Sequence, residues 1–471
     1  MPVSPHYRPD PAFVRLGPEF ADPVQPARFP QTILRHRNDR AAASVGLGTL
    51  TDEEWLAHFG RFEPLPRNLE TPLAMRYHGH QFRVYNPDIG DGRGFLFAQL
   101  RDDKGRLLDL GTKGSGQTPY SRFGDGRLTL KGGVREVLAA AMLEALGVPT
   151  SRALSLVETG EALQRNDEPS PTRSSVLTRL SHSHVRFGTF QRHAYFDKAA
   201  EIGQLVDHVV ETYYPSLGNA PNRAVALLEA VQTRTAELVG AWMAAGFVHG
   251  VLNTDNLNIT GESFDYGPYR FLPRNDPNFV AAYFDETGLY AFGRQPEAVF
   301  WNLRQLAGAL TLVSDPDPLV EVLNGFSGAY RTSLAAAMIR RLGVKPRGFD
   351  ADVDLVNAAF RALAEAGEPV RWEPFFFDWF GGAVSATRAL KGPRGSAYAG
   401  EHAATFRELL EAFEPDRPER LADSYFAREA PEELLYDEIE AIWAAIARED
   451  DWGPFHAKIA SIDAARRAWD F

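Results

Sequence analysis

A short polar loop followed by an acidic turn places the strongest constraint on how this chain can fold. Residues 249–256 read His-Gly-Val-Leu-Asn-Thr-Asp-Asn, and the turn Asp-Tyr-Gly follows at 265–267. Apolar residues on either side of the loop are typical of a short hairpin, which would bring Asn256 and Asp265 together at its open end. Oxygen ligands of this kind hold divalent cations such as Mg²⁺, although Asn and Asp residues also form ordinary turns.

The same pattern occurs in enzymes with a kinase fold, where a loop Asn and the Asp of an Asp-Phe-Gly turn bind magnesium. Against the pattern His-Gly-Asp-Leu-x-x-x-Asn of small-molecule kinases, the chain matches at positions 249, 250, 252 and 256. The base position is Val251, which cannot accept a proton, and the nearest carboxylate is that of Asp255. The loop therefore predicts a pseudokinase-like site that keeps the metal ligands and has moved the base.

A glycine-rich loop further upstream predicts a phosphate-binding site. Gly90, Gly92 and Gly94 alternate with polar residues, and two apolar strands follow at 95–100 and 107–113. Glycines at alternate positions let backbone N–H groups approach a phosphate closely. Lys113 ends the second strand, as the ATP-binding Lys of a kinase N-lobe does. Ordinary β-turns use the same residue types, so the loop alone decides little.

A helix expected over 133–146 supplies a partner for Lys113. Val134, Leu138, Met142 and Leu146 recur every four residues and form its buried stripe. Glu136 lies off this stripe, and we expect it to pair with Lys113 as in a kinase N-lobe. The alternative is a Glu favoured only by the helix N-terminal dipole.

Arginines add further positive charge to the predicted nucleotide site. The tetrapeptide Gly-Asp-Gly-Arg occurs at 90–93 and again at 124–127, and an Arg in such a loop can bind phosphate through two nitrogens. Arg179 and Arg186, together with Arg93 and Lys113, would provide four cations for one polyphosphate. Some of these arginines could instead pair with surface acids.

The order of the elements predicts an α+β, protein-kinase-like bilobal fold. We expect an N-terminal arm and extension over 1–75, including a short helix at 52–59, and a mixed α/β N-lobe with the nucleotide-binding loops over 76–190. A mainly helical C-lobe over 191–471 would carry the catalytic and metal-binding loop. Helices are expected at about 196–213, 222–245, 296–313, 318–342, 350–366, 402–413 and 431–447. The aromatic run 375–380 is expected in the core, with a partner-binding groove as the alternative.

Charge and composition exclude several functions. A net charge of −12 argues against nucleic acid as a main partner. The absence of cysteine excludes disulfides, thiolate nucleophiles and Cys-ligated zinc, and is compatible with a reducing compartment. No run of about 18 apolar residues occurs and the N-terminus has no apolar signal core, so we expect a cytoplasmic protein without a membrane span. Two histidines at 78 and 80 lack a third ligand at a diagnostic spacing, which favours a structural role over a metal site.

The motifs taken together resemble one family. They are Gly-Asp-Gly-Arg at 90–93 and 124–127, Asp-Leu-Gly-Thr-Lys-Gly-Ser-Gly-Gln-Thr-Pro-Tyr-Ser-Arg at 109–122, Arg-Glu at 135–136, Thr-Arg at 178–179, Arg-Phe-Gly at 186–188, and the loop and turn at 249–256 and 265–267. In this order they resemble the selenoprotein O family, whose bacterial members are also called YdiU. The resemblance covers about residues 30–300 most closely.

The resemblance implies a kinase-like fold that binds ATP in a flipped orientation and transfers AMP to Ser, Thr or Tyr hydroxyls of proteins, releasing pyrophosphate. It implies that Lys113, Arg179 and Arg186 hold phosphates, that Gly90, Gly92, Arg93, Asp125, Gly126 and Asp265 line the nucleotide, and that Glu136 orients Lys113. Asp255 would accept the proton. Asn256 and Asp265 would bind Mg²⁺, with Mn²⁺ as the alternative. Expected partners are ATP and protein substrates, with no nucleic acid and no membrane.

The chain departs from the family at its C-terminus, where many members carry selenocysteine or cysteine and this chain has neither. Redox control through that residue is therefore not expected. Two other functions stay open at this point: an inactive ATP-binding pseudokinase that acts as a scaffold, and a small-molecule kinase.

Overall fold

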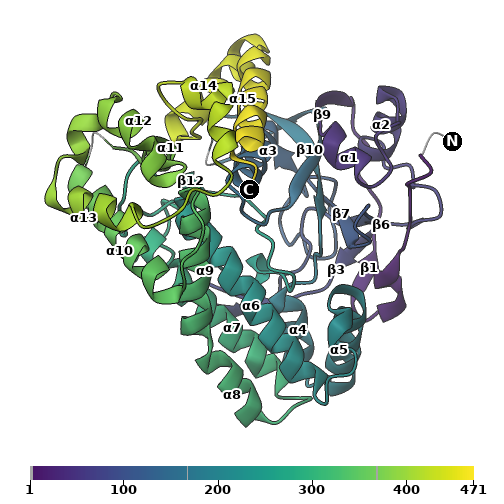
Figure 1. Cartoon of the computed structure of the whole chain (residues 1–471). Helices are drawn as coiled ribbons and strands as arrows, with labels where there is room; N and C mark the ends of the chain where they lie inside the picture. Colours follow the sequence, from purple (N-terminus) through teal and green to yellow (C-terminus); the bar gives the residue numbers. More distant parts are fainter. Residues whose placement is uncertain (1–3, 167, 368–369) are drawn as a thin grey trace.

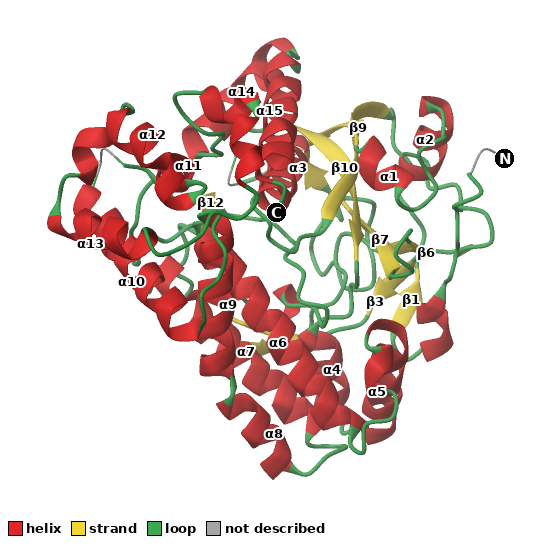
Figure 2. Cartoon of the chain, in the orientation of Figure 1, coloured by secondary structure: helices red, strands yellow, loops and turns green. Residues whose placement is uncertain are grey.

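The structure is a computed structural model that describes residues 4–166, 168–367 and 370–471. A curled antiparallel sheet occupies the first part of the chain, and most of the remainder is helical (Figures 1 and 2). Within the described residues, no helix is long and apolar enough to cross a membrane.

The main sheet has the strand order β1-β3-β6-β7-β10-β9-β2, with β8 paired to β10. Its strands are β1 (Ala21–Pro23), β2 (Ile33–Arg37), β3 (Leu73–Met75), β6 (Leu96–Arg101), β7 (Leu107–Lys113), β8 (Leu128–Thr129), β9 (Arg152–Leu163) and β10 (Thr172–Ser181). Two small two-stranded sheets stand apart from it: β4 (Gly79–Gln81) with β5 (Val84–Asn86), and β11 (Phe247–Val248) with β12 (Arg270–Phe271). The strands predicted at 95–100 and 107–113 are confirmed as β6 and β7.

The sheet is covered on both faces, which explains why β7 is buried at every position. One face packs against α3 (Leu130–Ala145), where Leu156 and Leu177 meet Val134 and Leu138. The other face packs against the N-terminal helices α1 (Asp39–Ala43) and α2 (Asp52–Phe59). Helix α2 has the predicted bounds because Thr51 and Glu54 form a capping box at its start.

The N-terminal segment contributes more than the expected extended arm. Its strands β1 and β2 form the two edges of the main sheet, pairing with β3 and β9 respectively. Short edge strands show too little alternation to be recognised from the sequence.

Helix α3 begins three residues before the predicted start, at Leu130, because the Thr129 side chain accepts a hydrogen bond from the backbone N–H of Gly132. Glu136 therefore lies in the second turn and not in the first. At that depth the helix dipole gives a carboxylate little stabilisation, so the pairing explanation for Glu136 gains weight.

The helical part begins with α4 (Phe187–Tyr195), α5 (Ala199–Tyr213) and α6 (Arg223–Ala244) and continues with α7 (Gln295–Leu310), α8 (Pro316–Asn324), α9 (Phe326–Arg341) and α10 (Phe349–Ala366). It ends with α11 (Trp372–Trp379), α12 (Ala386–Lys391), α13 (Glu401–Leu410), α14 (Tyr436–Glu449) and α15 (Gly453–Trp469). The single helix predicted over 318–342 is wrong, because Gly325 separates α8 from α9. The aromatic run 375–380 is buried, as predicted.

The last two helices return to the sheet. Helix α15 packs along α3, and α14 also contacts it (Figure 1). Asp450, between α14 and α15, forms ion pairs with Arg35 and Arg173 on β2 and β10.

Candidate nucleotide and metal site

A cavity of about 670 Å³ lies where the glycine-rich loops meet the predicted catalytic loop. Every predicted site residue lines it except Glu136 and Asn256. It also carries the cations Arg122, Arg127 and Arg165, which gives a strongly basic lining in a protein of net charge −12. A positive, loop-lined cavity of this size suits a nucleoside triphosphate.

Asp265 lies at the centre of the positive charge. Its carboxylate is 2.7 Å from Lys113 Nζ and 2.9 Å from Arg179 Nη1, and Arg186 Nη1 lies 3.5 Å away. Burial alone would raise the pKa of Asp265, but these three cations outweigh it and hold the pKa well below the usual value. Asp265 is therefore ionised at neutral pH, as a metal ligand must be.

The predicted Lys113–Glu136 pair is present. Lys113 Nζ donates to Glu136 Oε1 from one side and to Asp265 Oδ1 from the other. Both Lys113 and Glu136 are buried, at 6% and 3% exposure, so the pair is shielded from solvent and keeps the ammonium group at a fixed position.

Buried hydrogen bonds fix the catalytic loop relative to this cluster. The His249 ring bonds through Nε2 to the backbone oxygen of Phe264, directly before Asp265. Asn253 Oδ1 accepts hydrogen bonds from the Phe82 backbone and from the Tyr290 hydroxyl. Arg186 Nη1 donates to the backbone oxygen of Asp255 at 2.7 Å. Arg186, which we expect to bind phosphate, therefore also positions Asp255, the candidate base.

Asp255 is the carboxylate in this cavity whose raised pKa suits a general base. It lies in the short 3-10 turn Thr254–Asn256, and burial raises its pKa to about 6. Its Oδ1 is buried and has no hydrogen-bond partner within the described ranges. A carboxylate whose pKa lies near neutrality, with one unused oxygen, is suited to accept a proton from a bound hydroxyl.

The residues present fit a hard divalent cation. Asp265 is ionised, and Asp255 Oδ1 is an unpartnered oxygen. The Asn256 side chain uses its nitrogen to donate to the backbone oxygen of Val251 at 3.0 Å, which leaves its oxygen for another ligand. Over the described parts of the chain, no group of three or more His, Cys, Asp or Glu side chains could hold a metal. Mg²⁺ is commonly held by one or two carboxylates together with substrate phosphates.

The two Gly-Asp-Gly-Arg loops have different environments. Asp91 points inward: its Oδ2 accepts the backbone N–H of Met75, and Arg186 Nη2 lies 3.5 Å from its Oδ1. Asp125 is more exposed and pairs at 2.8 Å with Arg165, which lines the same cavity. Glycine is required at 90, because a Cβ there would lie 2.5 Å from the Tyr120 ring. A larger residue would displace Tyr120 from the wall of the cavity.

The cavity is also lined by Asp91, Tyr120 and Arg122, which were not predicted from the sequence. Asp91 could have been found, since it lies between two predicted glycines in a repeated tetrapeptide. The histidines at 78 and 80 have structural roles, as expected: His78 bonds to Tyr85 and His80 to Gln191.

Comparison with known proteins decides the family. The family model described as protein adenylyltransferase SelO matches residues 5–463. The chain belongs to this family. A protein nucleotidyltransferase YdiU of Synechocystis sp. is 45% identical over 475 residues, which is 96% of this chain and 97% of the relative. The protein of the same name from Gloeobacter violaceus is 46% identical and covers 96% of this chain and 94% of its own length.

Membership of the SelO family applies to the whole chain, since the match includes the N-terminal strands and most of α15. The resemblance proposed from the motifs is thereby confirmed. The chain is an adenylyltransferase-family enzyme, a protein nucleotidyltransferase.

Proposed function

We propose that this protein transfers AMP from ATP to Ser, Thr or Tyr hydroxyls of protein substrates, with Asp255 as the proton acceptor. The observation that carries the proposal is a buried carboxylate with a pKa of about 6 in the same cavity as Lys113, Arg179 and Arg186. We further propose the bilobal kinase-like arrangement with lobes at 76–190 and 191–471 after the 1–75 extension, and action in the cytoplasm, where ATP is abundant and a cysteine-free sequence is compatible with the reducing conditions.

In the proposed reaction a substrate hydroxyl attacks the α-phosphorus of ATP. Its proton passes to the carboxylate of Asp255, the new bond joins the protein oxygen to AMP, and the bond to pyrophosphate breaks. Lys113, Arg179 and Arg186 stabilise the charge that builds on the pyrophosphate, and Glu136 keeps Lys113 in place. Asn256 and Asp265 would hold Mg²⁺ or Mn²⁺, which when bound neutralises phosphate charge.

The flipped orientation of ATP explains why Val251 can occupy the position that holds the base in kinases. In that orientation the usual base position faces the wrong end of the nucleotide, so its loss does not prevent transfer. The proposal rests on the family resemblance for the flip itself and on the raised pKa of Asp255 for the base.

Labelled ATP distinguishes this function from the two others. AMP transfer labels protein from α-labelled ATP only, a scaffold labels nothing, and a small-molecule kinase passes the γ label to a metabolite. Intact-mass spectrometry provides the second measurement, because AMP transfer adds a whole nucleoside monophosphate and a kinase adds only phosphate.

Variants test the assigned base. Asp255→Ala should lose turnover while ATP binding survives, since a base acts mainly on the transition state. Adding Val251→Asp to that variant should not restore transfer. A phosphate-sized adduct that disappears in Asp255→Ala would replace this proposal with an unusual kinase.

A further inference from the structure

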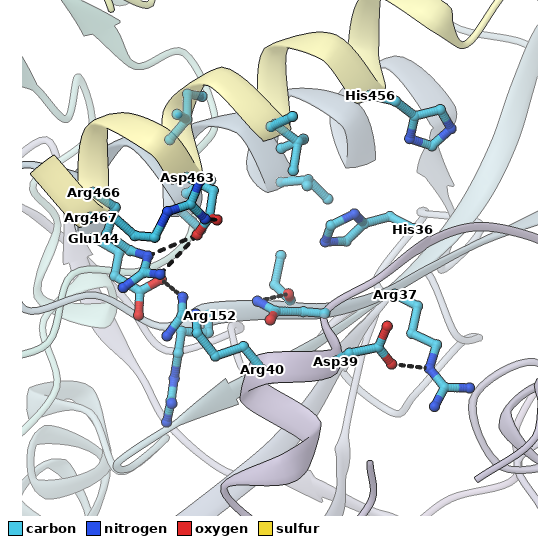
Figure 3. A pocket seen from close by; sticks show the side chains of 18 residues that line it. His36, Arg37, Asp39, Arg40, Glu144, Arg152, His456, Asp463, Arg466 and Arg467 are labelled. Carbon is cyan, nitrogen blue, oxygen red and sulfur yellow. Dashed lines mark hydrogen bonds and ion pairs between the residues drawn. The ribbon is translucent and has the colours of Figure 1, made fainter. Parts of the chain in front are cut away.

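A second cavity, of about 530 Å³, lies between β2, α1, α3 and α15 (Figure 3). None of its lining residues also lines the nucleotide cavity. Its volume falls in the range of sites that hold small organic ligands, roughly 300–1,000 Å³. None of the residues assigned to AMP transfer lines this second cavity.

The middle of the cavity is apolar. Val137 and Ala140 of α3 face Ile459 and Ile462 of α15 across it. These side chains would contact the carbon skeleton of a ligand, and burying that skeleton would favour binding.

One end of the cavity carries excess positive charge. Arg40 pairs with Glu144, and Arg466 and Arg467 both pair with Asp463, which leaves three guanidinium groups for two carboxylates. Arg152 lines the same cavity, and within residues 4–166, 168–367 and 370–471 its side chain forms no hydrogen bond or ion pair. Figure 3 shows these six side chains gathered at one end. Burial lowers the pKa of Arg152 despite the nearby carboxylates of Glu144 and Glu262, so a further anion would relieve an unfavourable buried charge.

The opposite end carries no excess charge, because its charged side chains Arg37 and Asp39 form an ion pair at 2.5 Å (Figure 3). His36 and His456 approach each other there (Figure 3). Burial, reinforced by His456, lowers the pKa of His36 to about 4, so its ring is neutral at pH 7. The lining therefore changes from cationic, through apolar, to a polar end whose charges balance, which matches an organic anion with an apolar body.

Helix α3 connects this cavity to the nucleotide site. Val137, which lines the second cavity, directly follows Glu136, which pairs with Lys113 in the first. A ligand filling the space between α3 and α15 would support α3 on the side away from the sheet. Glu136 would then be held more firmly against Lys113.

We propose that this cavity binds a small organic anion, a phosphate ester or carboxylate with an apolar body, as an effector that acts through α3 on the Lys113–Glu136 pair. The binding part stands independently of AMP transfer, whereas the coupling part rests on the proposed role of Lys113 in holding ATP.

Calorimetry on the full chain with phenyl phosphate tests the binding part. The protein is first saturated with a non-hydrolysable ATP analogue, so that the nucleotide cavity is occupied. Ala460→Phe places a ring in the second cavity without removing a charge, and Ala457→Phe adds the same ring to an exposed position of α15 outside the lining. We expect binding that weakens at least tenfold in Ala460→Phe and is unchanged in Ala457→Phe.

Arg466→Gln should also weaken the binding of phenyl phosphate. Repeating the titration with benzoate shows whether the site prefers a carboxylate or a phosphate. Inorganic phosphate should bind more weakly than phenyl phosphate, because it lacks the apolar body. If phenyl phosphate binds equally to the wild type and to Ala460→Phe, or binds to neither, the proposed binding site is wrong.

The coupling part is tested by the ATP dissociation constant with and without phenyl phosphate. We expect at least a twofold tightening in the wild type and none in Ala460→Phe. Binding of phenyl phosphate that leaves the ATP affinity of the wild type unchanged would overturn the action through α3. Both outcomes concern ATP binding, so the test remains valid even if the protein shows no AMP transfer.

Discussion

Two aspartates in the nucleotide cavity illustrate how the neighbours of a residue decide its role. Asp255 is buried and the Asp265 side chain, in the same cavity, is 22% exposed, yet the pKa of the first is raised to about 6 and that of the second is held well below its usual value. The difference follows from the cations: Lys113 and Arg179 contact the carboxylate of Asp265, whereas Arg186 bonds only to the backbone oxygen of Asp255. One carboxylate can thus accept a proton, and the other stays ionised as a ligand.

The pH dependence of transfer should report Asp255. Because only the carboxylate accepts a proton, we expect kcat/KM to fall about tenfold per pH unit below roughly pH 6 and to be level above it. Rates are measured at saturating metal, since a metal-bound triphosphate loses its last proton at a lower pH than free ATP. Asp255→Glu serves as the control and should shift this limb. A flat profile from pH 5 to pH 8 would argue against Asp255 as the base.

The same pKa values predict opposite effects on stability. Asp255 binds its proton more tightly in the folded state, so its contribution to stability is present at low pH and is lost as pH rises through about 6. At pH 7.5 its charge therefore costs on the order of 3 kcal/mol, and Asp255→Ala should raise the Tm of the nucleotide-free protein.

The contribution of Asp265 to stability has the opposite dependence on pH. Its depressed pKa contributes stability above its unfolded-state pKa that is lost only as pH falls through the folded-state value. Asp265→Ala should therefore lower the Tm at pH 7.5, and it also leaves three cations without their shared partner. The two single variants compared by thermal unfolding at pH 7.5 and pH 5 decide the question: a Tm for Asp255→Ala equal to or below that of Asp265→Ala would contradict the assignment.

Single residues of the site were partly predictable. The motifs identified Lys113 and Glu136 as a strand Lys followed by a helix Glu, and Asp255 and Asp265 as carboxylates of a polar loop and the turn after it. They could not distinguish Asp91 from the second Asp of the repeated tetrapeptide. The degree to which each Asp is buried depends on tertiary partners such as the Met75 backbone, which bonds to Asp91.

At the scale of elements, the position of α3 controls the site. Gly133 lets this helix approach the sheet, since a Cβ there would lie 2.5 Å from Leu156 Cδ1 and 2.7 Å from Ser175 Oγ. Both neighbours belong to the central strands β9 and β10 and are fully buried. The helix is thus held at the distance that lets Glu136 reach Lys113.

Gly133→Ala should therefore displace α3 by a few tenths of an ångström. We expect a loss of roughly 1–3 kcal/mol in stability, the usual cost of overpacking, together with a higher KM for ATP. Gly308→Ala in α7 is the matched control, because nothing lies within 4 Å of a Cβ there. Alanine should stabilise that exposed helix position by up to about 1 kcal/mol and leave KM unchanged. Equal effects of both variants on KM would mean that α3 does not position the site.

Elements with strong local patterns were predictable, and those defined by distant partners were not. Helix α2 and strands β6 and β7 follow from capping and from apolar runs within their own residues. The edge strands β1 and β2 exist only because β3 and β9 pair with them. Helix α15 begins with Gly453 and Pro454, which obscured its start, although proline is tolerated in a first turn.

At the scale of the whole molecule, the C-terminal helices connect the helical part to the sheet. Asp450 reaches Arg35 and Arg173 on the sheet, while α15 packs along α3. At its far end, Trp469 and Phe471 pack near the guanidinium of Arg341 on α9, at 5.3 and 5.7 Å. Changes at this end of the chain can therefore affect both the helical part and the helix that carries Glu136.

The buried ion pair beneath this contact provides the last prediction. Arg341 Nη2 lies 2.7 and 2.6 Å from the two carboxylate oxygens of Glu373 on α11, and the residues are 0% and 4% exposed. Glu373→Leu leaves a buried guanidinium without its counter-charge and should cost roughly 3–5 kcal/mol.

Replacing both partners, Arg341→Met with Glu373→Leu, removes the uncompensated charge and should recover most of that stability. The exposed pair Lys345–Glu414, at 3.1 Å with side chains 56% and 77% exposed, serves as the control, and Glu414→Leu should cost about 1 kcal/mol or less. Denaturant unfolding of the wild type and the three variants gives the free energies. If Glu373→Leu proves as stable as Glu414→Leu, the pair does not hold α9, α11 and the C-terminal segment together; if the double variant proves less stable than Glu373→Leu alone, Arg341 stabilises the protein through its aromatic neighbours and not through the ion pair.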